Sequence, residues 1–436
     1  MDETQSSYSI NLRQAVAKVQ TTETYSSKEN GLPFEPVFHT GGKDKGKSII
    51  SQWEELPTDN AIMLAVRRFV NREALLGKRF IRPSVTHGRS MLDSLSHGAV
   101  VWGDSYGNLF GSFDEKGSIM HDIVLKDDPY NFNQLAVMGL KDSITLERIL
   151  RASELMRSLG LPTERISHVR TLQEVFTVFG QKMTIKKWKR GVINHLAIDF
   201  RKERREPNFI QRAIEYFQHA DFVLIERETQ TAVRIKDVVE MAQTQAKFEQ
   251  LMSPVFAWLR AVKASGKEVL KGVPIPEKLD VHDSESIQKY FTEWLPKMMG
   301  TYLARMHNNG LSHGFASTHN FTAVGNLIDT DSVTGNPLGD KPIGTPEIQR
   351  DLYTTRSVVL SFFGLYQRAS KTKDTNGPYF LSGRTYVNNL LKGQTDTALR
   401  NFEQAYNHEI TPNSIAFDAK QYINSWKQGA EAVRPS

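Results

Sequence analysis

The chain contains no cysteine among its 436 residues, and this absence excludes several kinds of chemistry. A disulfide framework, a thiolate metal site and a cysteine nucleophile all require a thiol. Long apolar runs are also lacking, because a run such as 358–363 is far shorter than the ~20 residues that a membrane span needs. Residues 1–14 show neither the basic region nor the apolar core of a secretory signal. We therefore expect a cytoplasmic protein with no membrane partner.

The composition is that of an ordinary globular protein with a basic balance. Hydrophobic residues make up 39% of the chain and charged residues 24%, which is usual for a folded domain. The formal net charge of +6 favours loose affinity for polyanions, nucleotides among them. A chain of 436 residues is long for one hydrophobic core, so two lobes are expected.

The pattern along the chain predicts three regions. Residues 1–50 are rich in Ser, Thr, Lys and Gly and are expected to form a polar N-terminal arm. Residues 51–190 combine helical periodicity at about 58–76 and 143–159 with short strand-like runs at 99–102, 108–113, 118–125, 174–179 and 182–185. Residues 191–436 are expected to be mainly helical, with helix-compatible spacing at 208–219, 234–264, 284–309, 347–368 and 395–408.

The most informative stretch is 302–334. Apolar residues recur at three- and four-residue steps just before and within its start, which predicts one buried helix face formed by Met298, Met299, Tyr302, Leu303 and Met306. Gly310, which can adopt a positive φ, is expected to end this helix. The polar loop that follows carries His313 and Asn320, and a short apolar strand at 327–328 then leads to Asp329. Amide and carboxylate oxygens are hard ligands, suited to Mg²⁺ or Mn²⁺.

Two segments resemble the selenoprotein O (SelO) family of pseudokinases. Residues 313–329, HGFASTHNFTAVGNLID, resemble the family pattern His-Gly-x-x-Asn-Thr-Asp-Asn-Met-Ser-x-x-Gly-x-x-Ile-Asp, and the register holds without a gap. Residues 153–165, SELMRSLGLPTER, resemble Ser-Glu-Ala-Met-x-x-Leu-Gly-Ile-Pro-Thr-Thr-Arg. The resemblance spans roughly residues 100–335. It implies an α+β, two-lobed protein-kinase-like fold, with a smaller lobe of antiparallel sheet plus helix (51–190) and a larger, mainly helical lobe (191–436).

The resemblance also implies roles for three residues of the 313–329 segment. Asn320 and Asp329 would hold Mg²⁺ or Mn²⁺. His319 stands where the family has an aspartate thought to act as base, and an imidazole with an ordinary pKa near 6.5 can accept a proton. Phe315 occupies the position of the catalytic aspartate of protein kinases, so the usual kinase base is missing.

Further residues are expected to bind ATP by the same resemblance. Gly107 and Gly111 lie in YGNLFGSF, which is similar to the family's glycine-rich turn, although paired glycines also occur in plain hairpin turns. Lys126 would hold phosphates and Glu147 would orient Lys126, and each is alternatively a solvated charge. Arg190 is the candidate phosphate-binding arginine of a basic cluster at 186–190.

The function expected from this resemblance is AMP transfer from ATP to a Ser, Thr or Tyr hydroxyl of a protein substrate. Two alternatives remain open. The chain is either a kinase-type phosphotransferase, or a catalytically inactive pseudokinase that serves as a nucleotide- or protein-binding scaffold. A weaker alternative is nucleic-acid binding through the basic cluster at 186–190, which contains one tryptophan.

Overall fold

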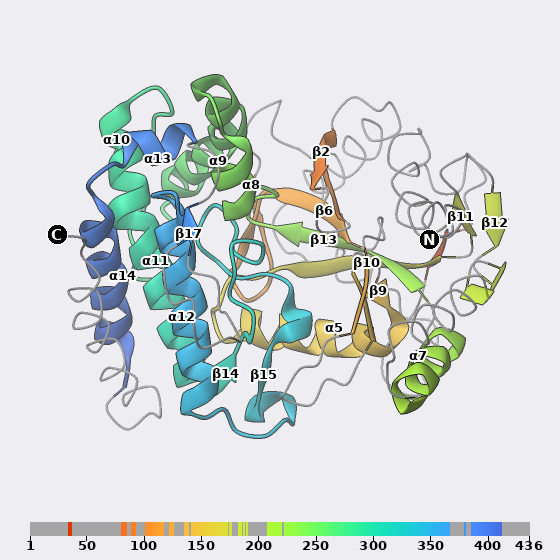
Figure 1. Cartoon of the computed structure of the whole chain (residues 1–436). Helices are drawn as coiled ribbons and strands as arrows, with labels where there is room; N and C mark the ends of the chain where they lie inside the picture. Colours follow the sequence, from red (N-terminus) through yellow and green to blue (C-terminus); the bar gives the residue numbers. More distant parts are fainter. Residues whose placement is uncertain are drawn as a thin grey trace. The chain divides into compact units, whose positions relative to one another are not determined.

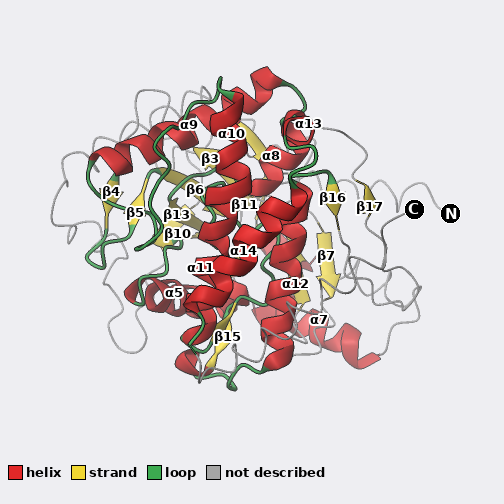
Figure 2. Ribbon diagram, turned by 90° about the vertical axis from the view of Figure 1, so that its left-hand side faces the viewer, coloured by secondary structure: helices red, strands yellow, loops and turns green. Residues whose placement is uncertain are grey.

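The computed structural model describes helices together with small antiparallel sheets, so the fold is α+β (Figures 1 and 2). The described residues are 34–36, 80–84, 89–92, 101–116, 122–125, 135–138, 141–172, 174–176, 182–184, 186–187, 189–190, 207–219, 222–366, 379–380 and 385–411. The chain divides into two compact units. Unit 1 comprises Met1–Ser94, Ser112–Leu150 and Arg165–Glu228, and unit 2 comprises Leu95–Gly111, Arg151–Glu164 and Thr229–Ser436. The predicted helix at 58–76 lies outside the described residues.

The main sheet belongs to unit 1. Its strands follow the order β1 (Phe34–Pro36), β10 (Arg165–Leu172), β13 (Phe222–Thr229), β6 (Ser112–Lys116), β3 (Arg89–Leu92) and β2 (Phe80–Ser84), with β9 (Lys141–Asp142) also paired to β13. The two strands β10 and β13 were not predicted, and β13 falls in the region expected to be mainly helical. Its apolar run is short enough to suit either a helix or a strand, and antiparallel pairing with β10 decides the outcome.

Two further hairpins and two helices complete the described part of unit 1. The hairpins are β7 (Asp122–Leu125) with β8 (Leu135–Met138), and β11 (Glu174–Phe176) with β12 (Lys182–Thr184). The helices are α5 (Ser143–Ser158), whose first half belongs to unit 1, and α7 (Pro207–His219). Both helices confirm the sequence prediction. Leu146 and Ile149 of α5 pack on Ile166 and Ile225 of the sheet, which places the core of this unit between helix and strands.

Unit 2 is mainly helical. Its helices are α8 (Ile235–Met241), α9 (Gln245–Ala264), α10 (Ser284–Lys289), α11 (Leu295–Asn308), α12 (Thr345–Ser361), α13 (Tyr386–Leu390) and α14 (Thr395–Glu409). A π-helical turn, Tyr290–Trp294, joins α10 to α11, so the predicted helix at 284–309 is nearly continuous. The predicted helix at 234–264 is interrupted, because Thr244 has an extended backbone and its hydroxyl caps α9 by accepting from the Lys247 N–H at 3.3 Å. The predicted helix at 347–368 ends at Ser361.

Short strands and turns connect these helices. They are β4 (Trp102–Gly103) with β5 (Leu109–Phe110), β14 (Leu311–Ser312) with β15 (Thr334–Gly335), and β16 (Leu365–Tyr366) with β17 (Tyr379–Phe380). Two short 3-10 turns cover Thr330–Ser332 and Asn336–Leu338. The strand expected at 327–328 is reduced to one isolated bridge between Phe321 and Leu327. Within the part of the chain that the structure describes, every helix is too short or too polar to cross a bilayer.

The core of unit 2 is organised around α11. Figures 1 and 2 both show α11 beside α12 and α14, and the three helices contact one another pairwise. The predicted apolar face is confirmed, since all five of its residues are fully buried: Met298, Met299, Tyr302, Leu303 and Met306. Gly310 has a φ of 69° and follows the end of the helix, as its position in the sequence predicted.

We predict that Gly300→Ala destabilises unit 2. Within a helix this change normally stabilises a protein by about 1 kcal/mol. A Cβ at position 300 would instead lie 2.4 Å from the Phe402 carbonyl oxygen and 3.1 Å from the Tyr406 nitrogen, both backbone atoms of α14 that cannot rotate away. Overpacking of this kind costs about 1–3 kcal/mol, and urea denaturation measures it. The exposed Lys297→Ala on the same helix should be nearly neutral, and equal stability of the two variants would contradict the prediction.

Candidate functional site

The loop 311–320 of unit 2 is held by one buried carboxylate, Asp351 of α12. Asp351 accepts hydrogen bonds from the Ser312 hydroxyl (2.7 Å), the His313 N–H (2.8 Å) and the Gly314 N–H (2.9 Å). Because Asp351 is 0% exposed, these donors have no competing water to bind. The position of the start of the loop is therefore set by α12.

A second histidine supports this carboxylate from behind. His307 of α11 donates from Nε2 to Asp351 at 3.3 Å, and its Nδ1 accepts from the Tyr406 hydroxyl of α14 at 2.8 Å. Burial alone would raise the pKa of Asp351, but His307, His313 and the Ser312 hydroxyl outweigh it and hold that pKa below the usual value. Asp351 is consequently ionised at neutral pH. Three helices thus converge on the anchor of the loop.

His313 links the loop to the segment that carries Asp329. Its Nε2 contacts the Ile328 carbonyl oxygen at 2.9 Å, and its Nδ1 contacts the Ser332 hydroxyl at 3.2 Å. A carbonyl can only accept, so Nε2 carries the proton and Nδ1 accepts from Ser332. Burial lowers the pKa of His313 and outweighs the opposing effects of Asp351 and the Ile328 carbonyl. The ring is therefore neutral and acts as a fixed connector.

Asp329 adopts the left-handed backbone conformation, with φ 75° and ψ 52°. It is the one non-glycine residue with a positive φ among the described residues. This conformation is unfavourable for a residue with a Cβ, so the neighbouring contacts must enforce it. The flanking residues are all fixed: Leu327 O accepts from the Thr163 hydroxyl at 2.7 Å, Ile328 O contacts His313, and the Thr330 N–H donates to Glu164 at 2.9 Å. Backbone strain of this kind is concentrated at functional sites.

Asn320 lies directly beside this segment. The Ile328 N–H donates to the Asn320 carbonyl oxygen at 2.9 Å, so Asp329 follows the residue that is paired with Asn320. Asn320 is only 5% exposed, and its side-chain nitrogen donates to the Phe315 carbonyl oxygen at 2.9 Å. That contact fixes the orientation of the amide, so its oxygen would be the atom that binds a metal. The two predicted metal ligands thus lie on adjacent backbone segments.

The donor chemistry of this pair fits a hard divalent cation. One amide oxygen and one carboxylate are the ligand types that Mg²⁺ and Mn²⁺ prefer. The hydroxyl oxygen of Ser317, three residues before Asn320, is buried and has no hydrogen-bond partner. A buried hydroxyl without a hydrogen-bond partner requires an explanation, and a bound ion is one of those known. Among the described residues, no group of three or more His, Cys, Asp or Glu side chains forms a metal site. Asn320 is not one of these residue types, so this absence does not bear on its amide oxygen.

The segment 230–237 fixes the other side of the loop. The backbone N–H groups of Ile235 and Lys236 donate to the carbonyls of Phe321 and Thr318, both at 3.0 Å. The buried guanidinium of Arg234 donates to the carbonyl of His319. This contact holds the backbone of His319 next to Asn320. His319 is half-buried as a residue, and the Nδ1 atom of its imidazole is buried.

Gly107 and Gly111 have structural reasons to be glycine. Gly107 has a φ of 86°, and its N–H donates to the Asp104 carbonyl at 3.1 Å. A Cβ at Gly111 would lie 2.2 Å from the ring of Trp258, and the Gly111 N–H donates to the Thr229 carbonyl at 2.9 Å. Since both N–H groups make internal hydrogen bonds, this conformation adds no support to a phosphate-binding role, which stays a prediction.

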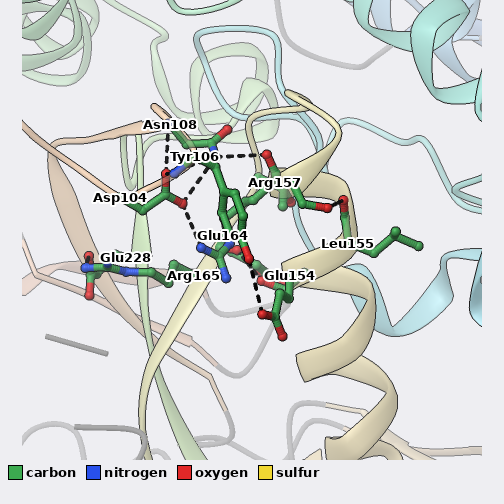
Figure 3. Close-up of polar contacts among 12 residues, drawn as sticks. Asp104, Tyr106, Asn108, Glu154, Leu155, Arg157, Glu164, Arg165 and Glu228 are labelled. Carbon is green, nitrogen blue, oxygen red and sulfur yellow. Dashed lines mark hydrogen bonds and ion pairs between the residues drawn. The ribbon is translucent and has the colours of Figure 1, made fainter. Parts of the chain in front are cut away.

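The hairpin that contains Gly107 is tethered to the end of α5 (Figure 3). Asp104 accepts from the N–H groups of Tyr106 and Asn108, and it pairs with Arg157 at 2.7 Å. Asn108 also donates to the Arg157 carbonyl at 3.2 Å. Because Asp104 and Arg157 neutralise each other's charge, these contacts indicate a structural role for the cluster.

Three predicted nucleotide ligands belong to unit 1. Lys126 lies outside the described residues. Glu147 is confirmed to lie on α5, and Arg190 is exposed, as are the neighbouring Lys186 and Lys187. Their roles stay predictions.

Sequence reasoning missed the residues that support the site: Asp351, His307, Glu164 and Arg234. Glu164 lies within the quoted segment 153–165, at a position where the family pattern has threonine, so the signal was a departure from that pattern. Asp351 and His307 are polar residues on the buried faces of α12 and α11, and the sequence around them does not reveal that they are buried. No protein-family model matches the chain, and no curated protein matches it.

We predict that His313 makes the protein less stable as the pH falls below about 6.5. The unfolded chain protonates His313 near its ordinary pKa of 6.5, whereas the folded protein, with a lower pKa, stays neutral until the pH is lower. Between pH 7 and pH 5.5 this difference costs up to about 1 kcal/mol. Chemical denaturation of wild type and His313→Gln across this range should show converging stabilities. Parallel curves would contradict the prediction.

Proposed function

We propose that the chain transfers AMP from ATP to a Ser, Thr or Tyr hydroxyl of a protein, in the manner of the SelO-like nucleotidyltransferases that its sequence resembles. The observation that carries this proposal is the left-handed backbone of Asp329, one residue after Ile328, whose N–H is hydrogen-bonded to the backbone of Asn320. A carboxylate and an amide carried on two fixed, adjacent backbone segments are hard ligands of the kind that such a cation uses. The two-lobed kinase-like fold is part of the same proposal.

Asn320 and Asp329 would hold Mg²⁺ or Mn²⁺ in this site. A bound divalent cation supplies neutralisation of phosphate charge and orientation of the phosphate groups. The protein's own contribution is rigidity. Because Asp351, His313 and Glu164 fix the backbone on each side of the two ligands, little reorganisation is needed when the reaction begins.

His319 is the candidate general base. The acceptor hydroxyl would form a bond to the α-phosphorus of ATP as pyrophosphate leaves, and its proton would pass to the imidazole of His319. Arg234 holds the His319 carbonyl, so the ring is attached to a fixed backbone directly before Asn320. An imidazole is a common general base in enzymes.

Phe315 favours a second candidate function, nucleotide binding without transfer. It stands where a kinase has its catalytic aspartate, and its side chain is 53% exposed. A phenylalanine accepts no proton, so an ordinary kinase reaction lacks its base at this position. The same residue therefore argues against phosphoryl transfer and for either AMP transfer or a nucleotide-binding scaffold.

We predict that Asp329→Asn abolishes labelling from ATP. Purified full-length chain is incubated with ATP labelled at the α- or the γ-phosphate, in the presence of Mg²⁺ and Mn²⁺. AMP transfer labels the protein from the α position alone. Asparagine tolerates the left-handed backbone but carries no charge, so Asp329→Asn removes the negative charge of the proposed ligand without adding strain. The loss should be at least about 10- to 100-fold, which is what even residues supporting a metal ligand produce.

The matched control is Asp396→Asn, the same change of charge at an exposed position of α14, which should label like the wild type. Label from the γ-phosphate alone would replace the proposal by a kinase-type phosphotransferase. Nucleotide binding with no label from either position would replace it by a scaffold.

A further inference from the structure

We propose that Glu164 is a positioning residue that holds Asp329 in its metal-binding conformation. Glu164 lies in the connection that follows α5, far from Asp329 in the sequence. This inference rests on the metal site of the proposed function. It goes beyond that site because it assigns a role to a carboxylate that binds neither metal nor nucleotide.

One oxygen of Glu164 receives two hydrogen bonds from the residue after Asp329. The Thr330 N–H and the Thr330 hydroxyl both donate to Oε1, each at 2.9 Å. Glu164 is 1% exposed and Thr330 is 0% exposed, so water cannot replace either partner. Hydrogen bonds to a carboxylate are stronger than those between neutral groups. The peptide that leaves Asp329 is therefore fixed by this one side chain.

The backbone of Glu164 is itself fixed, which is a requirement for a positioning role. Its carbonyl accepts from the Ser153 hydroxyl of α5 at 2.5 Å. The preceding residue, Thr163, donates its hydroxyl to the Leu327 carbonyl at 2.7 Å. The segment 163–164 thus holds the chain on both sides of Asp329, at residues 327 and 330.

The conformation of Asp329 explains why such a contact is needed. A φ of 75° is disfavoured for a side chain that bears a Cβ, and relaxation to an ordinary φ would redirect the peptide of Thr330. That relaxation would break both hydrogen bonds to Glu164 and would leave the buried N–H unsatisfied. Glu164 therefore opposes relaxation of the backbone at Asp329, the residue that directly follows the backbone partner of Asn320. Residues that orient a metal ligand in this way commonly change metal affinity although they never touch the metal.

The test measures binding of Mn²⁺ alone to the purified full-length chain, by electron paramagnetic resonance of free Mn²⁺. Glu164→Ala should weaken Mn²⁺ binding by about 10- to 100-fold. Glu164→Gln keeps an acceptor oxygen for both donors, so it should lose only about threefold, as a neutral acceptor replaces a charged one. Thr330→Val removes the hydroxyl but keeps the N–H, and its loss should fall between these two. Rescue by glutamine separates positioning from mere packing.

One control variant and one metal-free measurement test whether the effect is specific to the contact between Glu164 and Thr330. Asp104→Asn changes another buried carboxylate of unit 2, one whose contacts go to the hairpin and to Arg157, and it should bind Mn²⁺ like the wild type. Amide hydrogen exchange at Thr330, measured without metal, should be fast in Glu164→Ala and slow in the wild type. This second measurement requires no metal binding, so it tests the contact even if the metal site fails.

The outcomes distinguish the two proposals. Weak binding by both Asp329→Asn and Glu164→Ala supports the metal site and the positioning role. Weak binding by Asp329→Asn with wild-type binding by Glu164→Ala overturns the positioning role alone. Wild-type binding by Asp329→Asn overturns the metal site and the role of Glu164 toward it. If Glu164→Ala does not fold, equal Mn²⁺ binding by Thr330→Val and the wild type, or fast exchange at Thr330 in the wild type, overturns the positioning role.

Discussion

The buried carboxylate of Asp351 is the interaction on which the rest of the candidate site depends. A charge removed from water is costly unless its hydrogen-bonding capacity is filled. Here a hydroxyl, two backbone N–H groups and an imidazole fill it, from Ser312, His313, Gly314 and His307. These hydrogen bonds constrain the conformation of the loop, because a loop that moved away would leave the buried carboxylate without its donors.

A chain of hydrogen bonds connects Asp351 to Asp329, the proposed metal ligand. His313, whose backbone is held by Asp351, holds the carbonyl of Ile328 with its side chain. Asp329 follows, and Glu164 then fixes Thr330 from the opposite direction in the sequence. The left-handed residue is thus enclosed between two independent anchors. Either anchor alone would leave one side of Asp329 able to relax, which is why the strain persists.

The sequence predicted those features that local pattern controls. Apolar spacing predicted α11, and the sequence placed Asn320 and Asp329 on adjacent segments, which the backbone pairing of Asn320 with Ile328 confirms; their role as metal ligands stays a prediction. It did not predict β13, because a short apolar run becomes a strand only through pairing with distant residues. It also did not predict Asp351 as the anchor. An isolated aspartate in a helix looks like a solvated charge until the tertiary structure buries it, and no local rule reports that burial.

The anchors bear on the proposed AMP transfer, in which Phe315 would stand where a protein kinase has its acidic base. Where the base is a histidine or is absent, the remaining sources of rate enhancement are orientation and fixed electrostatics. Both require ligands that do not move when charge develops. A ligand held in a strained conformation by buried hydrogen bonds meets that requirement, since its stabilisation comes from Glu164 and His313 and is independent of any bound group. The same rigidity would serve a scaffold that binds nucleotide without reacting. Rigidity therefore supports the proposed metal site alone, and the proposed AMP transfer would additionally require His319 as its base.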